Sequence, residues 1–220
     1  MVDKKAYLKR QKCKTEYFNK RRFDKVMNAN KYLEKGLGIK VEENISDMIN
    51  AEASFVKFPC KHSVLLEGMK STNLYFIISG IVRGYYIDEQ GNDVTKCFSS
   101  ENEFFSSEGL RTGSISSFTI ECLEECQCIK LSYEFVHRII KKNENFKNLF
   151  ITLYLKEVNK LENRVKNLTL MNAEERYINF CKQYPYLHER IELKYIASYI
   201  GIRAASLSRI RNGMKNTFFN

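Results

Sequence analysis

The spacing of apolar residues changes twice along the chain. Residues 29–50 carry apolar side chains at helical spacing, interrupted at Gly36–Gly38. From Ala53 to Leu131 the spacing falls to two, in short runs separated by turn signals such as Ser79-Gly80. We expect strands over residues 54–58, 64–66, 74–78, 81–87, 94–98, 118–123 and 126–131. So many short strands at regular intervals are typical of a β-sandwich or a roll.

Helical spacing returns after Leu131. A short helix is marked by Phe135 and Ile139, and a longer one carries apolar residues every three or four positions from Phe146 to Leu168. The second stripe is narrow and its helix is long, which favours a helix that pairs with a second copy of itself. The residues expected at that dimer interface are Phe150, Tyr154, Val158, Leu161 and Val165. The alternative is a helix that lies on the β-roll.

A helix-start signal follows the long helix. Asn172, with Glu175 three residues later, resembles a capping box, so a new helix is expected there. Residues 170–172 are therefore expected to form a hinge between two helices. Tyr184-Pro185 is expected to end the new helix.

Residues 193–212 carry the pattern of a helix-turn-helix. Ile196 and Ala197 form the apolar face of a first helix, and Leu207 returns to the core on a second. Gly201 between them supplies the left-handed conformation that a tight turn needs. The exposed polar face that results suits DNA, because arginine bonds guanine in two places while serine or asparagine bonds a phosphate or a base edge. The candidate DNA-binding residues are Lys194, Arg203, Ser206, Ser208, Arg209 and Asn212. The alternative is an ordinary helical hairpin.

The charge distribution favours a polyanionic partner at the ends of the chain. The chain has 36 Lys and Arg against 26 Asp and Glu, a formal net charge of +10. Residues 1–26 hold ten basic residues and three acids, and residues 193–220 hold five basic residues and no acid, whereas residues 27–192 are nearly neutral. We expect residues 1–26 to be a basic extension, either an arm for nucleic acid or a leader without function. The alternative is a solvated, lysine-rich surface.

Composition excludes several classes of protein. No run of about 18 apolar residues exists, so neither a membrane-spanning helix nor a membrane partner is expected. The N-terminus lacks an apolar signal core and the seven cysteines are odd in number, which indicates a cytoplasmic protein with reduced thiols. Because the sequence shows no nucleophile–base pair, paired carboxylates or glycine-rich phosphate loop, the protein is not expected to be an enzyme.

A β-roll, a long helix and a C-terminal helix-turn-helix together resemble the Crp/Fnr family of transcription regulators, over roughly residues 29–212. The resemblance is carried by Leu65–Gly68, Leu74–Gly80, Ala173–Tyr177, Tyr195–Ile202 and Leu207–Arg211. It implies a homodimer that places its second helices in successive major grooves of a pseudo-palindromic double-stranded DNA site. RNA polymerase is a further expected partner if the protein is an activator. We also expect a change in the roll to rotate the DNA-binding domains about the hinge near residues 170–172.

The roll departs from the family members that bind cyclic AMP. Those members carry a Gly-Glu pair for the ribose and an Arg-Ser or Arg-Thr pair for the cyclic phosphate, whereas this chain has Ser106-Ser107 and Ser116-Ser117. A buried phosphate without an arginine is an unpaired charge. We therefore predict that cyclic AMP does not bind with useful affinity. The effector is then either another small molecule, in a pocket lined by Phe104, Ser106, Ser107, Ser116 and Ser117, or absent from a ligand-independent regulator.

The recognition helix departs from the family as well. Ala204-Ala205 stands where related sequences often have Pro-Glu or Arg-Glu. The carboxylate that accepts a hydrogen bond from cytosine is therefore missing. The DNA site is expected to differ from the usual family half-site.

Redox or metal sensing through the cysteines of the roll is a further alternative. Only Cys13 precedes Cys60, so the N-terminal cysteine cluster of the family's iron–sulfur branch is absent. Cys126 and Cys128 lie two apart on an expected strand and share a face, which is more typical of core residues than of ligands. No metal site and no bound cofactor are expected.

These observations predict an α+β chain in four parts. Residues 1–26 are the basic extension, and residues 27–142 are a cyclic-nucleotide-binding-like sensor domain built as a double-stranded β-roll (jelly roll). Residues 143–170 are the dimerisation helix, and residues 171–220 are the helix-turn-helix DNA-binding domain.

Overall fold

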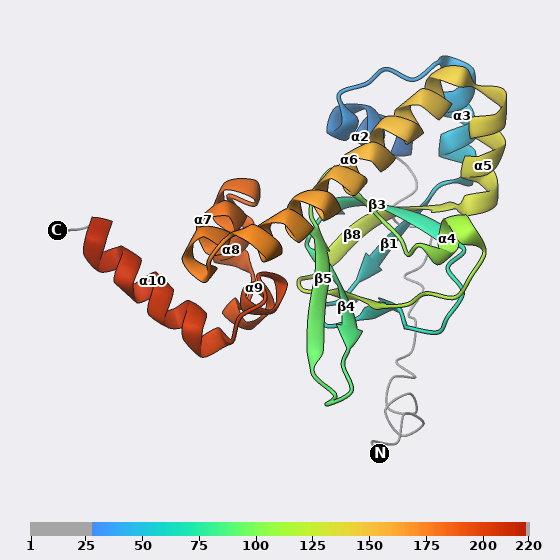
Figure 1. The fold of residues 1–220 in the computed structure, drawn as a ribbon. Helices are drawn as coiled ribbons and strands as arrows, with labels where there is room; N and C mark the ends of the chain where they lie inside the picture. Colours follow the sequence, from blue (N-terminus) through green and yellow to red (C-terminus); the bar gives the residue numbers. More distant parts are fainter. Residues whose placement is uncertain (1–27, 219–220) are drawn as a thin grey trace. The chain divides into compact units, whose positions relative to one another are not determined.

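The computed structural model describes residues 28–218, and for Arg111 and residues 215–218 it describes the backbone alone. The expected basic extension, residues 1–26, lies outside the described residues. The chain divides into two compact units, whose elements are labelled in Figure 1. Of the described residues, the first contains residues 28–82, 87–92 and 98–133, and the second contains residues 83–86, 93–97 and 134–218.

The first unit begins with two helices and continues as short strands. Helix α2 (Ala29–Leu37) begins after Asn28, whose side chain accepts a hydrogen bond from the Lys31 amide, and ends at Gly38 with φ of 66°. Helix α3 (Glu43–Glu52) follows. The strands are β1 (Ser54–Phe58), β2 (Ser63–Leu65), β3 (Asn73–Ser79), β4 (Val82–Ile87), β5 (Asp93–Ser99), β6 (Phe104–Phe105), β7 (Thr119–Cys122) and β8 (Cys126–Ser132). Most of β4 and β5, namely residues 83–86 and 93–97, belongs to the second unit. A single helical turn, α4 (Gly109–Thr112), lies between β6 and β7.

The strands form two four-stranded sheets, with strand orders β1-β8-β3-β6 and β2-β7-β4-β5. Strand β8 pairs antiparallel with β1 and with β3, which places Ile129 opposite both Phe55 and Phe76. Apart from β4 and β5, strands that follow one another in sequence lie in different sheets, as in β1 with β2 and β7 with β8. This arrangement confirms the roll predicted from the spacing of apolar residues.

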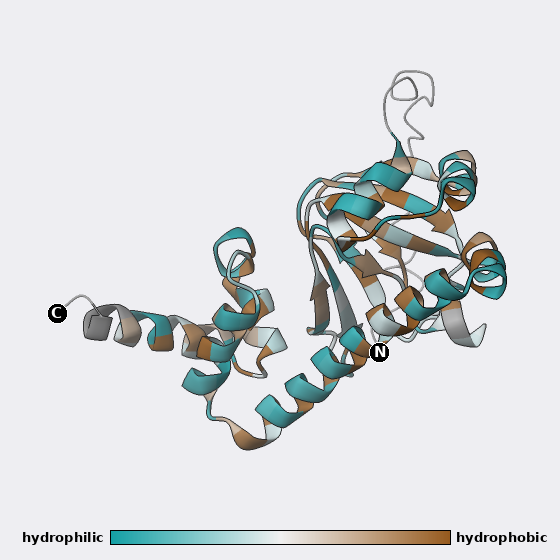
Figure 2. Ribbon diagram, turned by 90° about the horizontal axis from the view of Figure 1, so that it is seen from above, coloured by the Kyte–Doolittle hydropathy of each residue, from teal (hydrophilic) through white to brown (hydrophobic). Residues whose placement is uncertain are grey.

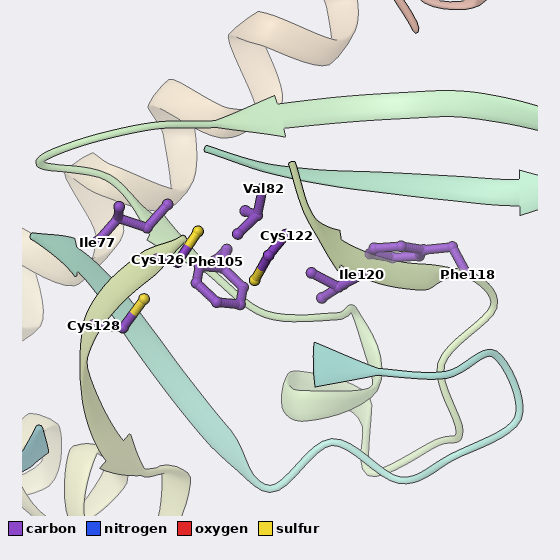
Figure 3. Close-up of a cluster of buried hydrophobic side chains, with 8 residues drawn as sticks. All are labelled: Ile77, Val82, Phe105, Phe118, Ile120, Cys122, Cys126 and Cys128. Atoms are coloured by element: carbon purple, nitrogen blue, oxygen red, sulfur yellow. The ribbon is translucent and has the colours of Figure 1, made fainter. Parts of the chain in front are cut away.

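A sulfur-rich apolar core fills the roll. Figure 3 shows eight buried side chains that converge from different strands and loops. They are Ile77, Val82, Phe105, Phe118, Ile120, Cys122, Cys126 and Cys128. The three cysteine side chains are fully buried, so the prediction that Cys126 and Cys128 are core residues is confirmed. Removing this apolar surface from water stabilises the roll.

The second unit consists mainly of helices. They are α5 (Tyr133–Lys142), α6 (Glu144–Leu170), α7 (Ala173–Gln183), α8 (Leu187–Arg190), α9 (Leu193–Tyr199) and α10 (Ala204–Phe218). The side chain of Asn143 accepts a hydrogen bond from the Phe146 amide and so begins α6. Asn172 and Glu175 form the predicted capping box, which begins α7 after the extended residue Met171.

Helix α6 presents apolar side chains that nothing in the described chain covers fully. Figure 2 shows hydrophobic and hydrophilic residues alternating along it. None of its 27 residues is buried. Leu161 and Val165 are 45% and 64% exposed. An exposed apolar surface of this kind is typical of an interaction site.

We expect Gly80 to be sensitive to the addition of one methyl group. Its φ is 104°, and a Cβ there would lie 2.7 Å from the Cys126 sulfur and 2.7 Å from the Glu125 carbonyl oxygen. Gly80→Ala should lower the free energy of unfolding by about 3 kcal/mol, because left-handed strain adds to overpacking.

The matched control is Gly91→Ala. Gly91 has a φ of 84° but open space where its Cβ would lie, so this variant should cost about 1 kcal/mol. Urea unfolding of both variants measures the difference. Equal losses would contradict the steric account.

Candidate nucleic-acid interface and sensor site

A tight turn joins α9 to α10. Gly201 has φ of 71° in this turn, and the Ile202 amide donates to the Ala197 carbonyl at 2.9 Å. Ala197 and Leu207 are 1% and 0% exposed, so the two helices share a closely packed underside. The helix, turn and helix predicted from the sequence are confirmed.

The outer face of α10 carries most of the candidate DNA-binding side chains. Ser208, Arg209 and Asn212 are exposed, and their spacing places them on one side of the helix. Arg203 is exposed in the residue before the helix, whereas Ser206 is half-buried in its first turn. The structure thus brings four of the six candidates to the solvent side of this helix and its start.

The sixth candidate, Lys194, lies on α9 and is already paired. Its Nζ is 2.8 Å from a carboxylate oxygen of Glu192. This hydrogen bond raises the pKa of Lys194 above its usual value. Lys194 is exposed, so it is cationic and accessible at neutral pH.

Not every arginine of α10 faces outward. Arg211 is half-buried, and its charge acts on Tyr177 and Cys181 of α7. Burial raises the pKa of Tyr177 to about 12, so this phenol is neutral beside the guanidinium. Arg211 therefore belongs to the packed side of α10, whereas Arg209, two residues earlier, belongs to the exposed side.

The C-terminal part of α9 contacts the β4–β5 hairpin. The Ser198 hydroxyl accepts a hydrogen bond from the Thr95 amide at 2.8 Å and donates to the Asp93 carbonyl at 3.3 Å. Thr95 has no exposed surface. Residues of β5 are therefore anchored on α9 by a side chain more than a hundred positions away in sequence.

Arg164 of α6 contacts the same two elements. Its Nη1 donates to the Lys96 carbonyl at 3.0 Å and its Nη2 to the Thr95 carbonyl at 2.9 Å. Its Nε and Nη2 both donate to the Tyr199 carbonyl at 3.2 Å, and its guanidinium lies 4.6 Å from the centre of the Tyr199 ring. One side chain thus joins α6, β5 and the end of α9.

Arg83 of β4 is a second arginine at this contact. It is 3% exposed, forms an ion pair with Asp93 and donates to the Thr95 hydroxyl at 3.4 Å. Its guanidinium lies 3.9 Å from the centre of the Tyr195 ring of α9 and 4.3 Å from that of Tyr85. The sequence pattern identified neither arginine as functional, because hydrophobic spacing carries no information about which distant carbonyl a guanidinium meets.

The serines expected to line an effector pocket have different environments. The Ser106 hydroxyl contacts the Ser71 hydroxyl at 3.0 Å and donates to the Asn73 carbonyl at 3.0 Å. The Ser107 hydroxyl is buried and has no hydrogen-bond partner among the described residues. Phe104 is half-buried, with its ring centre 5.1 Å from that of Phe76.

The other two expected pocket residues lie after α4. The Ser116 hydroxyl is buried and donates to the Phe118 carbonyl at 2.7 Å. Ser117 is exposed, and its amide donates to the Glu108 carboxylate at 2.8 Å. Glu108 therefore links the start of α4 to Ser117, and both serines are held by local bonds.

The environment of the core cysteines favours the thiol form at Cys122 and Cys128 but not at Cys126. Burial raises the pKa of Cys128, and a hydrogen bond between Cys122 and Cys126 raises the pKa of the first and lowers that of the second. Cys60 is exposed and its thiol donates to the Leu123 carbonyl at 3.1 Å. Within residues 28–218, no group of three or more His, Cys, Asp or Glu side chains could hold a metal ion.

In the part of the chain that the structure describes, no helix combines the length and the apolar run that crossing a bilayer requires.

Sequence comparison relates the roll to a known family. Residues 55–143 match the cyclic nucleotide-binding domain. The chain is 25% identical over 121 residues to a protein of Pasteurella multocida (strain Pm70), over 54% of this chain and 58% of that protein. It is 26% identical over 133 residues to one of Haemophilus influenzae (strain ATCC 51907 / DSM 11121 / KW20 / Rd), over 58% of this chain and 59% of that protein. Both are described as cAMP-activated global transcriptional regulator CRP, and the chain spans less than two thirds of their length.

Solved structures share the fold. FixK2 from Bradyrhizobium japonicum has a TM-score of 0.68 at 15% identity, over 75% of this chain and 85% of that one. The c-di-GMP responsive global regulator CLP from Xanthomonas campestris has a TM-score of 0.66 at 14% identity, over 80% and 93%. A CooA mutant from Carboxydothermus hydrogenoformans has a TM-score of 0.66 at 14% identity, over 88% of each chain. Likeness at these identities is evidence of shared fold alone.

Proposed function

Because the chain belongs to the Crp/Fnr family of transcription regulators, we propose that it binds pseudo-palindromic double-stranded DNA as a homodimer. The observation that carries the proposal is the outer face of α10, where Ser208, Arg209 and Asn212 are all exposed. Residues 193–220 contain no acidic residue, so α9 and α10 carry no carboxylate of their own that would repel a phosphate backbone. Such a face supplies both base-edge and phosphate contacts.

Selection of bound fragments from random DNA tests the proposal. The full chain should enrich a two-fold symmetric site, with half-sites about 34 Å apart and an affinity that falls as salt rises. Failure to enrich any sequence would overturn the proposal.

We propose further that the half-site differs from that of relatives with a glutamate in the recognition helix. Ala204 and Ala205 are exposed in the first turn of α10, and neither can bond a base. A methyl group at such a position suits the methyl group of thymine. Arg209, one turn later, and Arg203, just before the helix, are exposed arginines that can bond guanine in two places.

Arg209→Ala should weaken binding to the selected site by about 1–3 kcal/mol, because the bidentate bond to guanine is lost. Arg209→Lys is the matched control, since it keeps the charge but loses the planar pair of donors. Titrations of labelled DNA should show that Arg209→Lys keeps the salt dependence of the wild-type chain while losing discrimination at one base pair. An Arg209→Ala protein that binds its site normally would count against the assigned face.

The proposed dimer is formed by the apolar face of α6. Phe150, Tyr154, Val158, Leu161 and Val165 are separated by three or four residues, as in the seam of a coiled coil. In the single chain Tyr154, Leu161 and Val165 are exposed and Phe150 and Val158 are half-buried. A shallow groove lined by Val158, Leu161 and Val165 runs along the C-terminal half of this face.

Val165→Asp should weaken dimerisation about 100-fold, because the seam would bury an unpaired carboxylate. Asn163→Asp adds the same charge two residues earlier, on the opposite side of the helix, and should leave the dimer intact. Sedimentation velocity of both variants measures the effect. Equal weakening by the two substitutions would place the interface elsewhere.

We propose that cyclic AMP is not the effector. Between Glu103 and Phe118 the sequence holds two acids and one basic residue, Arg111. The Ser116 hydroxyl, at the place of the family's phosphate-binding pair, already donates to a carbonyl of its own chain. A cyclic phosphate would therefore lack the paired arginine and serine that the family uses.

Isothermal titration calorimetry should detect no binding of cyclic AMP at millimolar concentration, since the desolvated phosphate would remain poorly paired. The curated Pasteurella multocida relative, measured in the same buffer, is the positive control. Micromolar binding would refute the proposal and would direct attention to Arg111.

One observation favours an effector of another kind over a roll that serves only as a scaffold. The Ser107 hydroxyl is buried without a hydrogen-bond partner among the described residues, whereas most buried hydroxyls have one. A thermal-shift screen of small polar molecules separates the two cases, because a ligand of the folded state raises the melting temperature.

Further proposals concern catalysis, the cellular location, RNA polymerase and metal or redox sensing. We propose a DNA-binding protein without a catalytic step, acting in the cytoplasm. Its further partner is RNA polymerase if it activates transcription. Metal and redox sensing are not proposed, because the buried thiols of Cys122 and Cys128 are held protonated and are poor nucleophiles.

A further inference from the structure

Strand β5 lies at the edge of its sheet, and several of its backbone groups bond to side chains from helices. The Thr95 amide donates to Ser198, and the Thr95 and Lys96 carbonyls accept from Arg164. These groups are therefore not available for pairing with another strand. Its carbonyls also become fixed points against which the helices are held.

The bonds of Arg164 are directional. The guanidinium is planar and its donors have fixed angles, so a group that reaches carbonyls of both β5 and α9 admits little relative movement between them. One of its acceptors, the Tyr199 carbonyl, lies at the C-terminal end of α9, where a cation also meets the negative end of the helix dipole.

Arg83 and Ser198 hold the same two elements from other sides. Arg83 reaches from β4 to the ring of Tyr195, and Ser198 reaches from α9 to the backbone of β5. We call Arg83, Arg164 and Ser198 the hairpin clamp. Its members come from three different elements and meet around the fully buried Thr95.

The clamp spans the break between α6 and α7. Met171 is extended, with φ of −103° and ψ of 146°, so the peptide chain alone does not fix the direction in which α7 leaves α6. Arg164 lies before that break and Tyr199 lies after it. The clamp therefore helps to set the direction of α9 relative to α6, together with Arg176 of α7, whose Nη1 donates to the Leu168 and Met171 carbonyls at 3.3 Å.

We propose that Arg83, Arg164 and Ser198 are positioning residues that set the distance between the two recognition helices of the dimer. This inference rests on the proposed DNA-binding function. With α6 on the dimer axis, the orientation of α9 and α10 relative to α6 decides which spacing of half-sites both copies can reach at once. The clamp thus makes the protein selective for one spacing without contacting DNA.

The test uses the full-length dimer and DNAs that carry the selected half-sites at the natural spacing, at spacings changed by one or two base pairs, and singly. The wild-type chain should strongly prefer the natural spacing. In Arg164→Lys the preference should fall about tenfold, the scale of losing one hydrogen bond to a charged group. Affinity for a single half-site and the dimer mass should be unchanged. Lys147→Met is the matched control, because it removes an α6 cation whose ion pair with Glu144 stays within the helix.

A second variant covers the case in which Arg164→Lys does not fold. Ser198→Ala removes the hydroxyl that bonds the Thr95 amide and the Asp93 carbonyl and leaves both arginines, so it should lower the spacing preference about tenfold, as expected for two neutral hydrogen bonds. A spacing preference that both variants retain overturns the positioning role while leaving the DNA-binding proposal intact. An equal loss of affinity for every DNA also overturns it, because a merely structural role predicts that result. If the wild-type chain binds none of the DNAs, the proposed DNA-binding function is wrong, and so is the positioning role that rests on it.

Discussion

The guanidinium of Arg164 joins three segments of the second unit that the peptide chain leaves far apart in sequence. Its donors satisfy carbonyls of Thr95, Lys96 and Tyr199 that would otherwise depend on water. Because the group is flat and its donors diverge at fixed angles, α6, β5 and α9 cannot slide past one another without breaking several bonds at once. The direction in which α10 presents Arg209 and its neighbours depends on this contact. The proposed DNA binding therefore depends on Arg164, which does not belong to the exposed face of α10.

Burying Arg83 beside this contact makes sense as a device for geometry rather than for stability. The side chain of Arg83 is 3% exposed and that of Asp93 is 41% exposed, so desolvation of the guanidinium offsets much of the attraction between the two charges. Here the cost is reduced by Asp93, by the Thr95 hydroxyl and by the faces of two tyrosine rings. Each of these partners accepts the guanidinium in only a narrow range of positions. A leucine in place of Arg83 would have a smaller free-energy cost of desolvation, but it would leave α9 free to shift on the hairpin.

How far the sequence could predict the structure depends on the kind of interaction. The roll, the long α6 and the turn at Gly201 follow from local spacing and backbone preference. The capping box follows from the residue types and the spacing of Asn172 and Glu175. The exposed face of α10 follows in the same way, because helical periodicity alone places Arg209 outside and Leu207 inside. The hairpin clamp does not follow, because Arg164 is 68 and 69 positions from the carbonyls that it meets on β5. From the sequence of α6 alone, Arg164 would be interpreted as one more solvated charge. The unpartnered hydroxyl of Ser107 also depends on packing, which no local pattern encodes.

Strand β5 contains residues that bond to the clamp and residues that belong to the roll. Residues 93–97 belong to the helical unit and residues 98 and 99 belong to the roll, so a single strand is shared by both units through its backbone. Phe98 is a fully buried residue of the roll, and Lys96, two positions earlier, offers its carbonyl to Arg164. Successive side chains of a strand point to opposite faces, so Lys96 and Phe98 share a face and Cys97 lies on the other. Residues 95 and 96 are therefore held by Arg164 through their carbonyls, whereas Phe98 is held by burial of its side chain.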